Sequence, residues 1–198
     1  MPSDVPRQVG RLVHMSTIVD TPTERLVAEL YTVPGKAEIV GGRIVMMSPT
    51  GDMPSSAAFA IVVRLREFAK ENGGRAYGDN VGFLVSLPNR KSFCPDGAYY
   101  TGPRAQMKFL PSAPDFAIEV RSDSDYGPAA EREMSTKRAD YFAAGTKVVW
   151  DVDLLDEDVV RVYRAESPGQ PTVYRRGEMA EAEPAVPGWK FHVDELFE

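Results

Sequence analysis

Two acidic residues stand inside short apolar segments of this chain, and they constrain its fold more than any other feature. Asp96 lies in the segment CPDGAYY, and Glu119 lies in the segment PDFAIEVRS. Residues 116–120 have the composition of a buried β-strand, where an ionised glutamate is costly unless a positive charge compensates it. A second acid on a neighbouring strand adds repulsion, so a divalent cation bound by both side chains is the simplest compensation. The sequence therefore predicts a metal-binding acidic pair.

Length and composition are those of an ordinary globular protein. The chain has 198 residues, of which 43% are hydrophobic and 26% charged. The weak periodicity of residues 1–20 predicts an N-terminal arm or tail. The chain length predicts a single domain over residues 21–198. No apolar run approaches the roughly 20 residues of a membrane span, and the N-terminus lacks the apolar core of a signal peptide. Cys94 is the single cysteine, which excludes an intramolecular disulfide and fits a cytoplasmic location.

The net charge argues against bulk electrostatic binding of nucleic acid. Lysine and arginine number 23 against 29 aspartates and glutamates, which gives a formal charge of −6. A protein that coats nucleic acid is normally basic. A nuclease is still compatible with this charge, because catalytic carboxylates add negative charge where a metal ion binds.

The order of predicted elements is that of an α/β protein. Thr21, Pro22 and Glu24 form the start signal of a short helix, and Gly41-Gly42 supplies the turn of a β-hairpin over residues 37–47. The remaining expected elements are a helix from Ser55 or Ser56 to about Asn72, short strands near 75–79 and 81–87, a helix over 129–144, strands at 147–152 and 159–163, and one more strand after Pro184 with a final turn at 194–197. Together they predict a central mixed β-sheet flanked by helices.

One lysine falls on the apolar side of the predicted helix over residues 129–144. Lys137 shares this side with Met134 and Tyr141, while Arg138 falls at its margin. Two interpretations are open for Lys137. Its ammonium either extends along the apolar stem to water, or it points inward at Asp96 and Glu119.

Four segments, taken in order, resemble the Uma-type family of restriction-endonuclease-like proteins within the PD-(D/E)XK nuclease superfamily. These segments are YTVPGKAEIVGGRIVMMSP, CPDGAYY, APDFAIEVRSDSD and KRADYFAAGTKVVWDVD. The resemblance runs from about residue 30 to the C-terminus. It implies a restriction-endonuclease-like fold with magnesium bound at the acidic ends of the strands.

The resemblance also implies roles for individual residues. Asp96 after Pro95 matches the PD of the superfamily motif, and Glu119-Val120-Arg121 occupies the (D/E)XK positions. Arginine stands where the motif has lysine, and it cannot release its proton, so Arg121 is a candidate for phosphate contact rather than for a base. Lys137 matches a helix lysine of the family and is the candidate to replace the strand lysine.

The expected cofactor is Mg²⁺ or Mn²⁺, held by Asp96, Glu119 and the backbone carbonyl of Val120. Glu38 matches a glutamate at the start of the family's first hairpin, which makes it a candidate outer ligand or base, although an ordinary hairpin surface residue fits equally well. The implied activity is hydrolysis of phosphodiester bonds in nucleic acid, with DNA as the expected substrate. Superfamily nucleases often act as dimers, and Val9, Leu12 and Val13 of the N-terminal arm offer apolar contacts, so a homodimer is expected.

Two alternative functions remain open at the level of sequence. The first is a non-catalytic binding module that keeps the fold, favoured by the charge of −6, by Arg121 and by Met53-Pro54-Ser55-Ser56 where many relatives carry a histidine. The second is a metal-dependent hydrolase of a small phosphorylated substrate. The acidic cluster over residues 151–158 is expected to be a solvated hairpin rather than a calcium site. Four arginines form either a basic strip or ordinary strand faces: Arg161, Arg164, Arg175 and Arg176.

Overall fold

The segments predicted as strands and helices form a six-stranded β-sheet with helices on both faces. A computed structural model describes residues 21–198, so the arm expected over residues 1–20 lies outside the described residues. The elements are α1 (Pro22–Leu30), β1 (Ala37–Val40), β2 (Arg43–Met46), α2 (Asp52–Asn72), β3 (Arg75–Tyr77), β4 (Phe83–Leu84), β5 (Ser92–Phe93), β6 (Gly97–Tyr100), β7 (Phe116–Val120), α3 (Pro128–Ala143), β8 (Val148–Val152), β9 (Val160–Arg164), β10 (Thr172–Tyr174), β11 (Met179–Glu181), β12 (Lys190–His192) and the 3-10 helix η1 (Val193–Phe197).

The central sheet is mixed. Its strands lie in the order β10-β9-β8-β7-β6-β3, and only β7 and β8 run parallel, while the other neighbours are antiparallel. Helix α3 connects the parallel pair, as a parallel connection requires a crossover. The predicted class, an α/β fold with a central mixed sheet flanked by helices, is confirmed.

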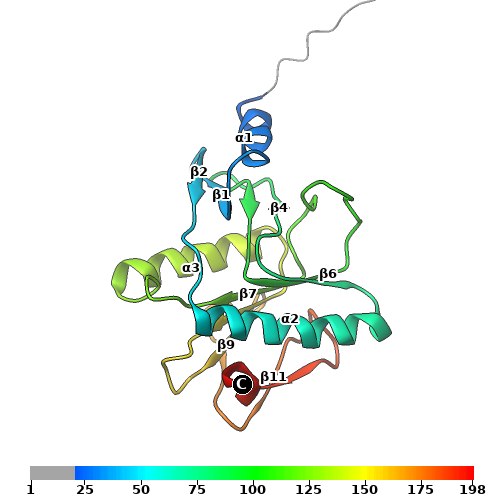
Figure 1. Cartoon of the computed structure of the whole chain (residues 1–198), viewed down its shortest axis with the longest axis vertical. Helices are drawn as coiled ribbons and strands as arrows, with labels where there is room; N and C mark the ends of the chain where they lie inside the picture. The colour runs from blue at the N-terminus through cyan, green and yellow to red at the C-terminus, as the bar shows by residue number, and fades with distance from the viewer. Residues whose placement is uncertain (1–20) are drawn as a thin grey trace, which may run out of the picture.

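The two faces of the sheet receive different helices because successive side chains of a strand alternate. On β7, Phe116, Ile118 and Val120 pack into the main core with α2 and the C-terminal segment. Ala117, between them, packs on the other face with Tyr141 of α3. Figure 1 shows α2 crossing one side of the sheet, and the hairpin β1–β2 at the opposite end of the molecule from β11 and the C-terminus. Glu119 alternates with the core residues and therefore points to the α3 face.

The predicted hairpin is confirmed as β1–β2, and its first strand contains the buried Glu38. Gly41 and Gly42 have φ angles of 59° and 73°, which the turn requires and which glycine adopts without strain. Strand β1 also lies beside β5, since Lys91 N–H donates to the carbonyl of Ile39 at 2.9 Å and Ile39 N–H donates to Ser92 Oγ at 2.8 Å. This second attachment turns Glu38 into the protein.

Close approach of α2 to the sheet depends on one glycine. A Cβ atom at Gly97 would lie 2.9 Å from Val62 Cγ2 of α2 and 3.0 Å from Ile118 Cδ1. The helix can therefore pack directly over the start of β6, next to Asp96. Within residues 21–198, no helix combines the length and the apolar character needed to cross a membrane.

The C-terminal third departs most from the sequence prediction. Strands β10 and β11 are each three residues long and were not predicted, because their short runs carry little periodicity. The strands expected near 75–79 and 81–87 are shorter than predicted, at Arg75–Tyr77 and Phe83–Leu84. The predicted helix over 129–144 is present as Pro128–Ala143.

Candidate active site

Asp96 and Glu119 are brought together by neighbouring strands. Asp96 immediately precedes β6, and its N–H donates to the carbonyl of Ile118 at 3.1 Å. Its Oδ2 accepts a hydrogen bond of 2.8 Å from the N–H of Val120. The Asp96 carboxylate is thus fastened to the end of β7, beside Glu119. The side chains of Asp96 and Glu119 are 14% and 21% exposed, so both are accessible at the bottom of a recess rather than on an open surface.

Helix α3 supplies two partners to Glu119. The Lys137 ammonium lies 2.8 Å from Glu119 Oε1 and 2.9 Å from Oε2. Tyr141, one turn later, donates its hydroxyl to Oε1 at 2.6 Å. The Tyr141 ring stacks on Phe93 of β5 with the ring centroids 3.9 Å apart, which fixes the hydroxyl in place. The structure thus places Lys137 in its inward orientation.

Glu38 lies behind Lys137 in the protein interior. Its Oε1 is 3.1 Å from the Lys137 ammonium and accepts the Cys94 N–H at 2.9 Å. Its Oε2 pairs with Arg90, whose Nε donates to Asp140 of α3 at 2.8 Å. Glu38 is 2% exposed, so it is not a hairpin surface residue. With both oxygens occupied, Glu38 is a second anchor for the ammonium of Lys137.

Lys36 belongs to the same site, although it was not predicted from the sequence. Its ammonium lies 2.5 Å from Asp96 Oδ1 and 2.7 Å from Asp79 Oδ1. A signal was present in the sequence, because Lys36 stands two residues before Glu38 and shares its side of an extended chain. Tyr141 and Arg90 were missed in the same way, since the sequence alone did not show which aromatic and basic side chains face the acids.

A cavity of about 770 Å³ opens onto these residues, and Asp96, Glu119, Val120, Lys36 and Lys137 are part of its lining. Two further arginines line it: Arg43 from β2 and Arg132 from α3. Neither forms an ion pair within the part of the chain that the structure describes. The cavity therefore contains two carboxylates that are paired with lysines, Asp96 and Glu119, and two guanidinium groups without an acidic partner among the described residues, Arg43 and Arg132.

Burial and charge affect the two glutamates in opposite directions. Burial raises the pKa of Glu119, and the neighbouring Asp96 and Glu38 add to this effect while Lys137 opposes it. Burial also acts to raise the pKa of Glu38, but Lys137, Arg90 and the Cys94 N–H together lower the pKa below its ordinary value. The protein therefore stabilises the charge on Glu38 and leaves the charge on Glu119 incompletely compensated.

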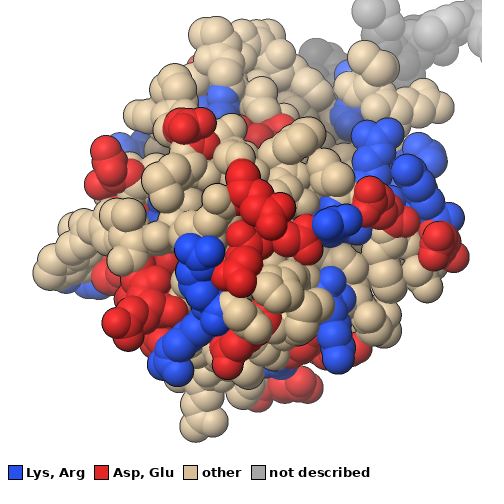
Figure 2. All heavy atoms as spheres, turned by 60° about the horizontal axis from the view of Figure 1, so that its bottom comes forward, with Lys and Arg blue, Asp and Glu red and all other residues tan. Residues whose placement is uncertain are grey.

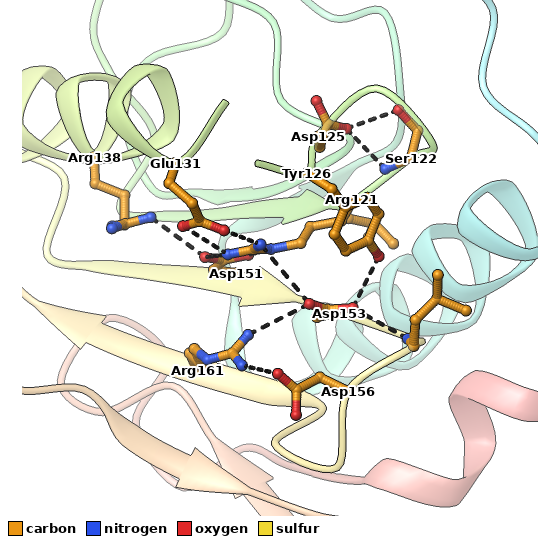
Figure 3. Close-up of polar contacts among 12 residues, drawn as sticks. Arg121, Ser122, Asp125, Tyr126, Glu131, Arg138, Asp151, Asp153, Asp156 and Arg161 are labelled. Carbon is orange, nitrogen blue, oxygen red and sulfur yellow. Dashed lines mark hydrogen bonds and ion pairs between the residues drawn. The ribbon is translucent and has the colours of Figure 1, made fainter. Parts of the chain in front are cut away.

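Arg121, the other candidate of the motif, lines the same cavity, but its guanidinium pairs with acids other than Asp96 and Glu119. Its guanidinium makes a two-pronged contact with Asp151 of β8, with Nε to Oδ1 at 2.8 Å and Nη2 to Oδ2 at 2.9 Å, and it also pairs with Glu131 of α3 (Figure 3). Asp151 is the parallel neighbour of Glu119 across the sheet. Arginine forks match carboxylates well, so Arg121 is drawn to Asp151 rather than to Asp96 or Glu119.

The same network accounts for much of the acidic cluster over residues 151–158. Asp151 and Asp153 are 1% and 4% exposed, so they are not part of a solvated hairpin. Arg138 lies 3.3 Å from Asp151, and Tyr126 donates to Asp153 at 2.9 Å (Figure 3). Asp156 pairs with Arg161 at 2.6 Å. Each of these acids has a partner within the protein.

The arginines near the C-terminus do not form a free basic strip. Arg175 pairs with Asp158 at 2.7 Å, Arg176 pairs with Asp194 at 2.7 Å, and Arg164 pairs with Glu181. Figure 2 shows acidic and basic side chains interspersed on the face that carries the C-terminal strands. Arg164, Arg175 and Arg176 are therefore each paired with an acid.

The donor chemistry of the cavity fits a hydrated magnesium ion. Mg²⁺ takes oxygen ligands and is often held by one or two carboxylates with water in the other positions. Asp96 and Glu119 offer such carboxylates, and Val120 lines the same cavity. Within residues 21–198, no three acid, histidine or cysteine side chains converge as a ready ligand set. Instead, the ammonium groups of Lys36 and Lys137 pair with the two acids.

A mixed sheet that places two acids at adjacent strand ends, with a helix lysine beside them, defines a restriction-endonuclease-like protein. The chain belongs to the Uma2 family, described as "Putative restriction endonuclease", which matches residues 27–194. It is also similar to the crystal structure of "a putative nuclease belonging to DUF820" from Anabaena variabilis ATCC 29413, with a TM-score of 0.67 and 20% sequence identity over 87% of this chain and 97% of that one. No curated protein matches the chain.

Proposed function

We propose that this protein is a metal-dependent nuclease that hydrolyses phosphodiester bonds of nucleic acid, with DNA as its substrate. One observation carries the proposal. Asp96 and Glu119 reach the same cavity from adjacent strands, and Lys137 lies against Glu119 at 2.8 Å. Membership of the Uma2 family supports the same activity.

In this proposal Asp96, Glu119 and the carbonyl of Val120 hold Mg²⁺ or Mn²⁺. Such an ion would supply a Lewis acid and would lower the pKa of a coordinated water. The residues themselves arrange the site. The hydrogen bond from Val120 to Asp96 keeps the first carboxylate at the end of β7, and the Tyr141 hydroxyl orients the second one.

Lys137 acts as a fixed positive charge in this scheme. Two carboxylates hold its ammonium, and Glu38 is buried, so the lysine stays protonated and its direction is set. Such a group stabilises negative charge that develops on a phosphate during hydrolysis. Glu38 contributes by positioning Lys137, and Arg90 keeps Glu38 ionised.

The unpaired arginines of the cavity suit a substrate with several phosphates. Arg43 comes from the hairpin and Arg132 from α3, so they approach the cavity from different elements. Guanidinium groups bind phosphate oxygens through paired N–H donors. A nucleic acid backbone that crosses the cavity would present one phosphate to the acidic pair and its neighbours to these arginines.

Specific observations also favour the two alternatives. The contacts of Lys36 with Asp96 and of Lys137 with Glu119 neutralise the acids without a metal, which suits a non-catalytic binding module of the same fold. The cavity volume of about 770 Å³ lies within the range of small-molecule sites, which suits a hydrolase of a small phosphorylated substrate.

A cleavage assay with matched variants separates these functions. Purified protein is incubated with supercoiled, linear and single-stranded DNA, with RNA, and with a chromogenic phosphodiester, each with Mg²⁺, Mn²⁺ or EDTA. Asp96→Asn and Glu119→Gln keep the side-chain shape and should abolish cleavage. Asp115→Asn is the control, because Asp115 binds Thr101 and Lys147 at the other end of β7.

The outcomes point to different functions. Metal-dependent cleavage of nucleic acid that disappears in both site variants and persists in Asp115→Asn supports the nuclease. Cleavage of the small ester alone favours the third function. Binding of nucleic acid with no cleavage under any condition favours the binding module. Cleavage that persists in Asp96→Asn would be assigned to a contaminant and would contradict the proposal.

A further inference from the structure

Lys36 bridges an interior acid and a surface acid. Its ammonium is 2.5 Å from Asp96 Oδ1 and 2.7 Å from Asp79 Oδ1. The side chains of Lys36 and Asp96 are 12% and 14% exposed, whereas that of Asp79 is 51% exposed. The three residues come from separate parts of the chain: Lys36 precedes β1, Asp79 follows β3, and Asp96 precedes β6.

This arrangement conflicts with a cation bound at Asp96. A divalent ion on the Asp96 carboxylate would lie within a few ångströms of the Lys36 ammonium, and like charges at such distances repel strongly in a recess. Lys36 and the metal ion therefore compete for Asp96. In the protein without metal, Lys36 is the counter-ion that makes this part of the acidic pair stable.

Among the described residues, Lys137 has no acidic partner outside the site that could hold its ammonium away from Glu119. Its two acidic partners, Glu119 and Glu38, both lie inside the site, and Glu38 is buried. Lys36 differs because one of its partners stands at the surface, outside the acidic pair. If Lys36 gave up Asp96, its contact with Asp79 would still provide an acidic partner.

We propose that Asp79 is the residue that retains Lys36 when a divalent cation takes Asp96, so that Lys36 and Asp79 together set the metal affinity of the site. This inference rests on the proposed function, because it assumes the metal site of the nuclease. In the metal-bound protein, Lys36 stays paired with Asp79 at the edge of the cavity and presents its ammonium to a substrate phosphate. Asp79 is a positioning residue that acts through Lys36.

Metal binding by four forms of the full-length protein tests the inference without any substrate. Isothermal titration with Mg²⁺ and with Mn²⁺ is carried out on wild type, Lys36→Met, Asp79→Asn and the double variant. Lys36→Met removes the competitor and should tighten binding about tenfold, while its melting temperature without metal should fall. Asp79→Asn should weaken binding by about fivefold, because Lys36 then has Asp96 as its single acidic partner.

The double variant distinguishes positioning from simple charge removal. A surface carboxylate attracts a cation from a distance, so Asp79→Asn alone would weaken binding under either explanation. If Asp79 acts through Lys36, its replacement has no effect once Lys36 is methionine, and the double variant binds metal as Lys36→Met does. Additive effects of the two substitutions would overturn the inference.

A lysine–aspartate pair elsewhere in the fold provides the control. Lys147 pairs with Asp115 at 2.9 Å. The two residues immediately precede β8 and β7, at the end of the sheet opposite the acidic pair. Lys147→Met removes the same charge and should leave metal affinity unchanged.

If wild type binds neither ion, the proposed metal site itself fails and the inference fails with it. If wild type binds and Asp79→Asn matches it, the inference alone is wrong. Because Asp79 is half-exposed, Asp79→Asn should fold even if Lys36→Met does not.

Discussion

The ammonium of Lys137 lies 2.8 Å from Glu119 and joins helix α3 to the end of strand β7. Tyr141 is the one fully buried side chain of α3. Three further ion pairs connect α3 to the rest of the protein: Arg138 with Asp151, Glu131 with Arg121, and Asp140 with Arg90. The position of α3 therefore depends on ion pairs, and the same pairs decide where Lys137 points.

Replacing Lys137 should lower both the stability of the protein and the activity of each folded molecule. Lys137→Met keeps the apolar stem but leaves Glu119 and Glu38 without their shared cation, so unfolding by urea should require about 3 kcal/mol less free energy. Phosphodiester cleavage per folded molecule should fall at least about 10²-fold. Arg138→Met is the control, because Arg138 contacts Asp151 and the Tyr163 ring rather than the acidic pair. Equal activity in wild type and Lys137→Met would remove Lys137 from the proposed mechanism.

Replacing Arg121 should affect stability more than chemistry. In Arg121→Met the buried Asp151 keeps, of the described residues, only Arg138, 3.3 Å away, as a cationic partner. This loss should lower the free energy of unfolding by about 3 kcal/mol. Arg121→Lys keeps the charge but loses the two-pronged contact and should cost about 1–2 kcal/mol. Arg175→Met removes an exposed pair and should change stability by less than about 1 kcal/mol. A loss of cleavage in Arg121→Lys at full stability would instead support a direct role for Arg121 in the chemistry.

Metal binding should become stronger as pH rises above 4.5. The folded protein raises the pKa of Glu119 above its ordinary value of 4.5, so the folded chain holds this proton at pH values where the unfolded chain has lost it. Glu119 therefore lowers the stability of the metal-free protein as pH rises from 4.5 through the raised pKa. A metal ion must displace this proton, so binding should release protons within that window.

Calorimetry in buffers of different ionisation enthalpy measures this proton release directly. Wild type should release a fraction of a proton per bound ion at pH values near the raised pKa, and none well above it. Glu119→Gln has no such proton and should bind weakly at every pH. A proton release that is the same in both proteins would assign the titration to another group.

The unpaired cavity arginines should govern nucleic acid affinity. Arg43→Ala and Arg132→Ala, measured with EDTA to prevent cleavage, should each weaken DNA binding and reduce the slope of log K against log salt by about 1. Arg66→Ala is the control, because Arg66 is exposed on α2 and does not line the cavity. Fluorescence anisotropy at several salt concentrations gives these slopes. Equal slopes in all four proteins would place the nucleic acid elsewhere.

Much of the fold could be read from the sequence because its signals are local. The Gly41-Gly42 turn, the buried strand around Glu119 and the helix over residues 129–144 follow from residue types a few positions apart. The short strands β10 and β11 could not be read in this way. Three residues are too few for a periodic pattern, and these strands exist because neighbouring strands pair with them.

The sequence by itself determined that two acids lie in short apolar segments and that Lys137 is on the apolar side of its helix. Only the tertiary structure decided which charges meet, because ion pairs join residues far apart in the chain and depend on side-chain reach. It brought Lys36 to Asp96 across 60 residues and directed Arg121 to Asp151 instead of to the acidic pair. A carboxylate in a recess takes whichever cation the surrounding strands and helices bring within hydrogen-bonding distance, and that choice is made by packing.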